Sequence, residues 1–303
     1  MRRLAILALA LALTTQSIAT AAKPPRPREA VATIAVTVSR GGGPAVGLTA
    51  DDFVVVVDGG SLDPITVEPP LPLAVLVLID QSESMRPPTR GPGRPLDGEL
   101  SGALKPGDSV RFGRIGNGVT IDPPVPGITQ KDLRNAIKAW PDPEEFAPSP
   151  LWDGVLQASR AFGDTSHRHL ITLVTDGRST ANHASAEDAA RAAIQARAAV
   201  SIIDEGRTSV INQDNRNAVA VRSSPVLEWL CRLTGGRYYQ DPITLNRAYT
   251  PAPAEMLAGA IRDQRFHYRV SFAVPDDGKY HELRVRVTEP GTTVYAPTLV
   301  KGS

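Results

Sequence analysis

The sequence has one cysteine, almost no net charge and no apolar run long enough to cross a membrane. Because Cys231 is the only cysteine among 303 residues, no disulfide can form within the chain. Lysine and arginine number 33 and aspartate and glutamate 32, which gives a formal net charge of +1. Proteins that bind phosphate backbones usually carry a clear basic excess, so a nucleic-acid partner is not expected. Hydrophobic residues make up 42% of the chain, which is enough for a packed core.

The N-terminal residues have the pattern of a secretory signal peptide. Arg2 and Arg3 give a positive start, residues 4–13 are an unbroken run of Leu, Ile and Ala, and residues 19–21 are small. The apolar run is shorter than the roughly 20 residues that a membrane span needs. An uncleaved anchor that also uses residues 14–22 remains the alternative. We expect residues 1–22 to be a cleaved signal peptide, so that the mature chain has no membrane span and is exported, either periplasmic or secreted.

Changes of pattern divide the rest of the chain. Residues 23–30 are rich in proline and arginine and are expected to form a linker. Residues 31–70 read as β-strands, residues 71–245 alternate buried strands with helices, and residues 262–303 return to strands. The alternation predicts an α/β fold with a doubly wound, mostly parallel sheet. Because neither flanking segment has enough strands for a stable covered sheet, we expect both to pack together as one smaller β-sandwich-like module.

Two continuous apolar runs define the predicted α/β sheet. Residues 73–79 (LAVLVLI) and 170–175 (LITLVT) show no polar alternation, which is typical of strands buried on both faces. The other expected strands are 109–115, 199–203 and 237–240, and the expected helices are 129–139, 151–162, 186–198 and 224–233. Cys231 lies in the last of these helices and is expected to be a small buried hydrophobe rather than a nucleophile.

Oxygen-bearing side chains cluster where the predicted strands end. Residues 80–84 (DQSES) follow the first buried strand, residues 149–153 (SPLWD) open a helix, and residues 175–177 (TDG) end the second buried strand. Ligands of open α/β sheets collect outside the carboxyl ends of the strands, near a switch in strand order. Two carboxylates and three hydroxyls form a hard-oxygen set of the kind that Mg²⁺ prefers. In an extended loop, alternate side chains face the same way, so Asp80, Ser82 and Ser84 could converge on one ion.

These segments resemble those of von Willebrand factor type A (vWA) domains. Residues 73–85 (LAVLVLIDQSESM) resemble the first strand and the Asp-x-Ser-x-Ser motif of that family. Residues 149–155 resemble the segment that supplies a metal-binding threonine, and residues 170–177 resemble the strand that ends in a second metal-binding aspartate. Residues 230–239 resemble the late helix, the Thr-Gly-Gly turn and an aromatic edge strand. The matches fall in the family's order, and residues 71–245 are accordingly expected to be a vWA domain.

The resemblance implies a metal-ion-dependent adhesion site (MIDAS). It implies Mg²⁺, or else Mn²⁺ or Ca²⁺, held directly or through water by Asp80, Ser82, Ser84, Ser149 and Asp176. An acidic side chain of a protein partner would complete the coordination. Such sites bind and do not catalyse turnover, so the resemblance implies a non-enzymatic binding protein. The flanking strands also resemble those of a bacterial, secreted vWA-related group.

The sequence departs from the family pattern at two places. Ser149 stands where threonine is usual, which keeps the hydroxyl but loses the methyl that restricts the side chain. Residues 86–95 (RPPTRGPGRP) replace the usual start of the first helix, and proline and glycine cannot continue a helix there. This segment is expected to be a loop at the rim of the site. Its arginines either attract an acidic partner or form an ordinary solvated surface.

Two other functions fit parts of the pattern. A haloacid-dehalogenase-type phosphatase also places a catalytic aspartate after a buried strand, but it needs a second carboxylate two residues later, where this chain has Ser82. The fold could also be a structural scaffold with a silent metal site. His167 and His169 could form a small metal site, although polar residues entering a strand explain them as well. No Gly-x-Ser-x-Gly hydrolase motif is present.

Overall fold

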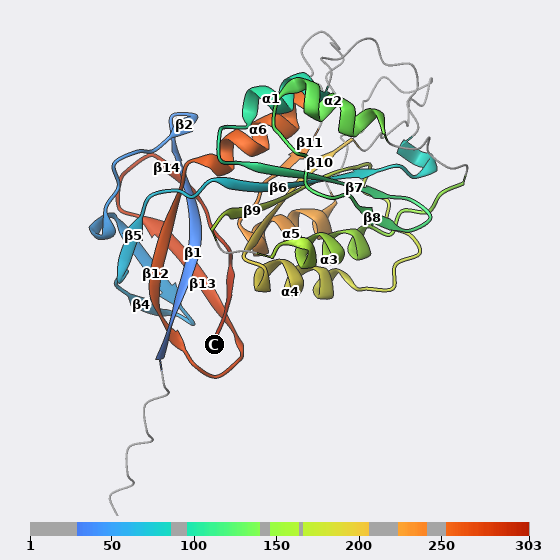
Figure 1. Cartoon of the computed structure of the whole chain (residues 1–303). Helices are drawn as coiled ribbons and strands as arrows, with labels where there is room; N and C mark the ends of the chain where they lie inside the picture. Colours follow the sequence, from blue (N-terminus) through green and yellow to red (C-terminus); the bar gives the residue numbers. More distant parts are fainter. Residues whose placement is uncertain are drawn as a thin grey trace, which may run out of the picture.

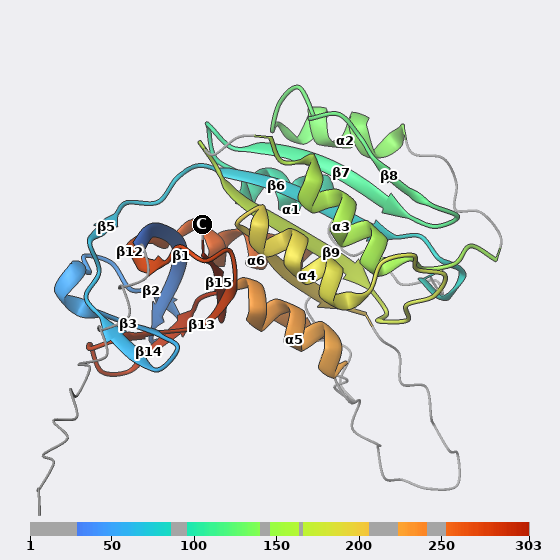
Figure 2. The ribbon, with the colours of Figure 1, turned by 90° about the horizontal axis from the view of Figure 1, so that it is seen from below.

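The structure is a computed structural model that describes residues 29–85, 96–139, 146–163, 166–205, 224–240 and 253–302. The predicted signal peptide, most of the predicted linker and the predicted loop 86–95 lie outside these residues. Two units lie side by side (Figures 1 and 2): an α/β unit and an all-β unit. Among the described residues, no helix is long and apolar enough to cross a membrane.

A six-stranded sheet forms the centre of the α/β unit, in the order β11-β10-β9-β6-β7-β8. Its strands are β6 (Leu73–Asp80), β7 (Ser109–Ile115), β8 (Val119–Ile121), β9 (Arg168–Thr175), β10 (Ala198–Asp204) and β11 (Tyr238–Gln240). All neighbours are parallel except β8, which pairs antiparallel with β7 at one edge. The strand order reverses between β6 and β9, as in doubly wound folds. The predicted fold class is therefore confirmed.

Helices cover both faces of this sheet (Figure 1). On one face lie α1 (Leu96–Ala103), α2 (Gln130–Lys138) and α6 (Pro253–Arg265), and on the other α3 (Leu151–Ala161), α4 (Ala186–Gln195) and α5 (Pro225–Thr234). Strand β6 shows why its sequence has no polar alternation. Leu73, Val75 and Val77 belong to the core on the first face, and Leu76 and Leu78 to the core on the second. Cys231 of α5 is a free, buried residue of the second core, as expected.

The structure adds three elements that the sequence patterns did not predict: α1, α6 and β8. Helix α6 continues the α/β unit past residue 245, and Leu257 and Ile261 pack in its core. Because α6 ends at Arg265, the C-terminal strands begin at His267 rather than at residue 262. At the other end, the first strand already includes residues 29 and 30, which the pattern had assigned to the linker.

The all-β unit consists of two sheets built from both ends of the chain. One sheet has the order β14-β1-β12-β5, with β2 paired to β1, and the other has the order β15-β13-β3-β4. The strands are β1 (Glu29–Arg40), β2 (Gly43–Pro44), β3 (Phe53–Val57), β4 (Gly60–Leu62), β5 (Thr66–Glu68), β12 (His267–Pro275), β13 (Tyr280–Val287), β14 (Thr292–Tyr295) and β15 (Leu299–Lys301); a short 3₁₀ turn, Ala50–Asp52, precedes β3. Strand β1 pairs with β12, and β3 pairs with β13. The predicted sandwich of N- and C-terminal strands is thus confirmed.

Backbone and side-chain contacts join the two units. Thr234 at the end of α5 forms an isolated bridge with Pro297, and the amide of Thr298 donates to the Leu233 carbonyl at 3.3 Å. The Gln195 amide donates to the Tyr280 hydroxyl at 3.2 Å.

Within the α/β unit, the turn after α5 passes close to β10. A Cβ at Gly236 would lie 1.9 Å from the carbonyl oxygen of Val200 in β10, so only glycine fits this approach.

Candidate metal centre

Asp80 is the centre of the predicted site and ends strand β6. Its side chain is buried, with 2% of the residue exposed. One carboxylate oxygen accepts the amide N–H of Ser82 at 2.9 Å. The other accepts the Ser149 hydroxyl at 2.7 Å and the Thr175 hydroxyl at 2.8 Å. Burial raises the pKa of Asp80, and the hydrogen bonds from Ser149, Ser82 and Thr175 offset this only in part.

The two serines after Asp80 lie together. The hydroxyl oxygens of Ser82 and Ser84 are 3.2 Å apart, which agrees with the expectation that alternate side chains of this loop face the same way. The loop is attached to its neighbours by backbone bonds: the Gln81 amide donates to the Ile115 carbonyl at 2.8 Å, and the Glu83 amide donates to the Ala147 carbonyl at 3.3 Å. These bonds fix the loop beside the end of β7 and the segment before α3.

Ser149 reaches Asp80 from the segment that precedes α3. Its amide donates to the Thr180 hydroxyl at 2.9 Å, and the Thr180 amide donates to the Ser149 carbonyl at 2.8 Å. This reciprocal pair ties the Ser149 segment to the loop after β9. Ser149 is buried, with 2% exposed, so the hydroxyl is held in place although the threonine methyl is missing.

Asp153 holds the same loop from within α3. Its carboxylate accepts the amide N–H groups of His183 at 2.9 Å and Ala184 at 2.8 Å. Burial raises the pKa of this carboxyl, but the N–H groups of His183 and Ala184 outweigh it and lower the pKa overall. Asp153 therefore positions the loop. Within the described residues it has no hydrogen bond to Asp80.

Asp176 follows Thr175 directly, at the start of this loop. Gly177 comes next with φ +79°, a left-handed conformation that favours glycine, and it turns the chain sharply away from β9. The Asp176 carboxylate accepts the Arg178 amide at 3.1 Å and lies 3.7 Å from the Arg178 Nε. In the described part of the chain these are its polar contacts. The structure therefore brings Asp80, Ser82, Ser84 and Ser149 together and leaves Asp176 beside them, paired with an arginine.

Thr175 belongs to the predicted cluster of oxygen-bearing residues, but the sequence analysis did not assign it a contact with Asp80. It lies at the carboxyl end of β9, is fully buried, and donates to Asp80 while accepting the Gly177 amide at 3.1 Å. A β-branched residue in an apolar run looks like ordinary strand core, so only its position beside Asp176 could have marked it. The site as a whole lies at the carboxyl ends of β6 and β9, where the strand order reverses.

The histidines at the start of β9 are explained by packing. The His169 ring stacks on Phe162 with centroids 4.3 Å apart and has a hydrogen bond of 2.7 Å to the Ala196 carbonyl. His167 has hydrogen bonds to Ser166 and to the Gly107 carbonyl. Across the described ranges, no group of three or more His, Cys, Asp or Glu could hold a metal ion.

Comparison with solved structures finds likenesses of fold. The α/β part of the chain is similar to vWA domains. A vWA protein from Catenulispora acidiphila aligns over 91% of this chain and 73% of its own, with 12% identity and a TM-score of 0.44. An aerotolerance-related membrane protein from Bacteroides fragilis aligns over 63% of this chain and 98% of its own, with 15% identity and a TM-score of 0.45.

A third similar structure is proximal thread matrix protein 1 of the mussel byssus, described with a zinc-occupied MIDAS motif. It aligns over 66% of this chain and 49% of its own, with 13% identity and a TM-score of 0.44. No family model and no curated protein matches the sequence. Identities of this size do not indicate the ligand of this chain.

Proposed function

We propose that this chain is an exported, non-enzymatic protein that binds a protein partner through one divalent metal ion. The observation that carries the proposal is the environment of Asp80. A buried carboxylate lies at the switch point of a doubly wound sheet and accepts the hydroxyls of Ser149 and Thr175, and the hydroxyls of Ser82 and Ser84 lie together in the loop that follows it. Burying a carboxylate away from cations is unfavourable, and a divalent ion at this place would compensate for it.

The donor set fits a hard cation. Carboxylate and hydroxyl oxygens are ligands of Mg²⁺, with Mn²⁺ or Ca²⁺ as alternatives, and they do not suit metals that prefer nitrogen or sulfur. Asp80, Ser82, Ser84, Ser149 and Asp176 would hold the ion. When bound, the ion would offer a positive charge to an acidic side chain of the partner. With two protein carboxylates at most, binding should be weak until the partner supplies a further oxygen.

The contacts of Asp80 argue against a hydrolase. A phosphatase of the haloacid-dehalogenase type needs an acid at position 82, where this chain has a serine whose amide donates to Asp80. Among the described residues, the Ser149 and Thr175 hydroxyls donate to the Asp80 carboxylate itself, and neither is hydrogen-bonded to a histidine or to a second carboxylate that could act as its base. We therefore expect no hydrolytic turnover, and metal-dependent phosphatase activity that disappears in Asp80→Asn would overturn the proposal.

Calorimetry with Mg²⁺ on the full mature chain tests the metal site. Wild type should bind one ion weakly, and Asp80→Ala should show no binding, because it removes the central ligand. Asp122→Ala is the matched control, since Asp122 is a partly buried carboxylate paired with Arg114 outside the site. Equal Mg²⁺ binding by wild type and Asp80→Ala would remove Asp80 from any metal site.

Affinity purification tests the partner. Wild type and Asp80→Ala serve as baits, each with Mg²⁺ and with a chelator. A partner that wild type retains only with Mg²⁺, and that Asp80→Ala does not retain, supports metal-dependent binding. A partner retained equally under all four conditions would instead support the structural scaffold with a silent metal site.

A further inference from the structure

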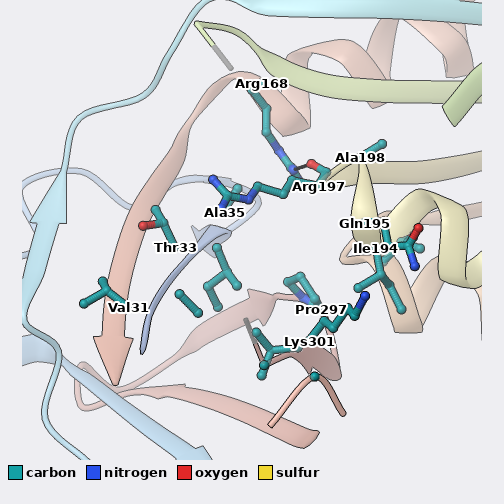
Figure 3. Close-up of a pocket in the computed structure, with 16 residues that line it drawn as sticks. Val31, Thr33, Ala35, Arg168, Ile194, Gln195, Arg197, Ala198, Pro297 and Lys301 are labelled. Atoms are coloured by element: carbon teal, nitrogen blue, oxygen red, sulfur yellow. Dashed lines mark hydrogen bonds between the residues drawn. The ribbon is translucent and has the colours of Figure 1, made fainter. Parts of the chain in front are cut away.

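A cavity lies between the α/β unit and the β-sandwich, and the charged side chains that line it are all positive. Its volume is about 510 Å³, within the range typical of small-molecule sites. The charged residues that line it are Arg168, Arg197 and Lys301, and none of its lining residues is acidic. Figure 3 shows these side chains between the first strand of the sandwich and the end of α4, with Pro297 on the sandwich side.

Arg168 is a buried cation without an acidic partner. Only 6% of the residue is exposed. Its guanidinium donates to the Arg197 carbonyl at 2.6 Å and more weakly to the Gln264 side-chain oxygen at 3.4 Å, whereas its buried Nε has no hydrogen-bond partner in the described part of the chain. A buried charge is unfavourable unless it is paired, and arginine stays charged at any ordinary pH. The charge of Arg168 is therefore uncompensated.

The nearest titratable neighbour adds no negative charge. Burial and the charge of Arg168 lower the pKa of His267 to about 4, so its ring is neutral at physiological pH. The ring accepts the Leu71 amide at 3.3 Å and lies 2.9 Å from the Gln264 carbonyl, which agrees with a neutral ring. Nothing that surrounds Arg168 in the described residues balances its charge.

Arg197 occupies a backbone position that favours glycine. Its φ is +52°, two residues after the end of α4, where glycine usually ends a helix. An arginine at this position is strained, and its side chain has no ion pair among the described residues. In Figure 3 the side chain extends toward Ala35 of β1. The strained backbone therefore places a second cation, which is exposed to solvent, at the rim of the cavity.

The rest of the wall is mainly apolar. Val31, Ile34, Ile194, Pro297 and Val300 line it. The hydroxyls that line it are already used: Thr33 pairs with Ser271, and Thr234 bonds to backbone groups. The cavity thus combines one buried, unpaired cation and two exposed cations with aliphatic walls, a pattern that fits an anion with an apolar body.

We propose that this cavity binds a small organic monoanion with a carboxylate head and an aliphatic body. The carboxylate would pair with Arg168, Arg197 and Lys301, and the aliphatic part would pack against the residues of β1 and Pro297. The site is separate from the candidate metal centre. Arg168 begins β9 and Thr175 ends it, so the two sites lie about 23 Å apart along the strand, at about 3.3 Å per residue.

Calorimetry with octanoate on the full chain, in the presence of a chelator, tests the proposal. Wild type should bind octanoate, and the double variant Arg197→Gln/Lys301→Gln should bind it at least about tenfold more weakly, because the charge pairs are lost. Octanol, which has the same chain without the charge, should also bind wild type at least about tenfold more weakly. Arg168→Gln is less suitable, since Arg168 also bonds to Arg197 and Gln264 and its loss could unfold the chain.

Lys105→Gln serves as the control. It removes an exposed lysine that does not line the cavity, so this variant should keep wild-type affinity for octanoate. Failure of wild type to bind octanoate at millimolar concentration would overturn the proposal. So would equal octanoate affinity in wild type and the double variant, or equal affinity of wild type for octanoate and octanol.

Discussion

At the scale of single residues, Asp176 and Leu76 are expected to behave in opposite ways. Asp176 directly follows Thr175, which hydrogen-bonds to Asp80, and Asp176 is the second carboxylate of the proposed ligand set. Replacing Asp176 by alanine removes this ligand, and the ion pair that it breaks is with the exposed side chain of Arg178. Asp176→Ala should abolish metal-dependent partner binding and change the free energy of unfolding by less than about 1 kcal/mol, measured in chelator.

Leu76→Ala is the matched contrast. Leu76 is fully buried in β6, so the substitution should cost about 2–5 kcal/mol of stability through a lost side chain and a cavity. Partner binding should then fail only where the protein unfolds. Thermal melts and metal-dependent pull-downs of both variants make the comparison. Full partner binding by Asp176→Ala in chelator would contradict the adhesion function.

Phe146 is expected to contact the partner. It is 77% exposed and has φ +57°, an unusual conformation for an aromatic residue, three positions before Ser149. Exposed, strained aromatic residues beside a binding site are candidates for contact. Phe146→Ala should weaken partner binding about tenfold, while Mg²⁺ binding stays unchanged. Val46→Ala, which alters an exposed apolar residue of the sandwich, should change neither; loss of Mg²⁺ binding in Phe146→Ala would mean that Phe146 supports the site rather than the partner.

The position of the Asp80 carboxylate was easier to predict from the sequence than the residues that hold it in place. Asp80, Ser82 and Ser84 were visible because they directly follow a buried strand, where ligands of open α/β sheets bind. The roles of Thr175 and Thr180 were not predicted, because they depend on long-range hydrogen bonds to Asp80 and Ser149. Such contacts arise only when separate loops are brought together by the sheet.

At the scale of elements, a histidine clasp joins two turns of the sandwich. One ring nitrogen of His281 in β13 lies 2.7 Å from the Asp58 carboxylate, in the turn after β3, and the other lies 2.9 Å from Asp277, in the turn before β13. The hydrogen bond that the His281 ring donates to the Asp58 carboxylate is the main cause that raises the pKa of His281 above its usual value. The protonated ring is therefore preferred in the folded state.

This clasp predicts a pH dependence of stability. A raised folded-state pKa means that the stabilisation is complete below the unfolded-state pKa of about 6.5 and is lost as the pH rises through the folded-state pKa. The difference in free energy of unfolding between wild type and His281→Gln should shrink as the pH rises above 6.5. Denaturant melts across this range measure it. Asp58→Asn should flatten the profile in the same way, and a constant difference across the range would show that the clasp does not depend on protonation.

The elements that the patterns missed share a physical reason. Helix α6 packs against α1, β9 and β10, but its buried apolar residues all fall within positions 256–261. A stretch this short does not show a helical repeat in the sequence. Strand β8 has three residues and depends on pairing with β7 rather than on its own sequence. By contrast, β6 and β9 were plain from their unbroken apolar runs, because both of their faces are covered.

At the scale of the whole molecule, the two ends of the chain depend on each other. The sandwich was predicted because each β segment alone would leave a sheet uncovered. In the structure, β1 pairs with β12 and β3 pairs with β13, so each sheet uses strands from both ends of the chain. The chain between β5 and β12 forms the α/β unit, so the sandwich holds both ends of that unit. The cavity lined by Arg168, Arg197 and Lys301 lies where the two units meet, which is why no local sequence pattern predicted it.

Deleting residues 267–303 should therefore expose the N-terminal strands. The deletion removes β12 and β13, so that β1 loses its partner from Glu29 to Thr37 and β3 loses its partner along its whole length. The apolar side chains of Val36, Val38 and Val55, which are fully buried in the intact chain, would become accessible. Unpaired strands with exposed apolar faces associate with other chains.

We expect the truncated protein to aggregate, whereas further deletion of residues 29–68 should restore a soluble α/β unit because it removes the unpaired strands. Size-exclusion chromatography and thermal melts of both truncations measure this. A soluble, monomeric 1–266 fragment that melts like the full chain would show that the N-terminal strands do not need their C-terminal partners.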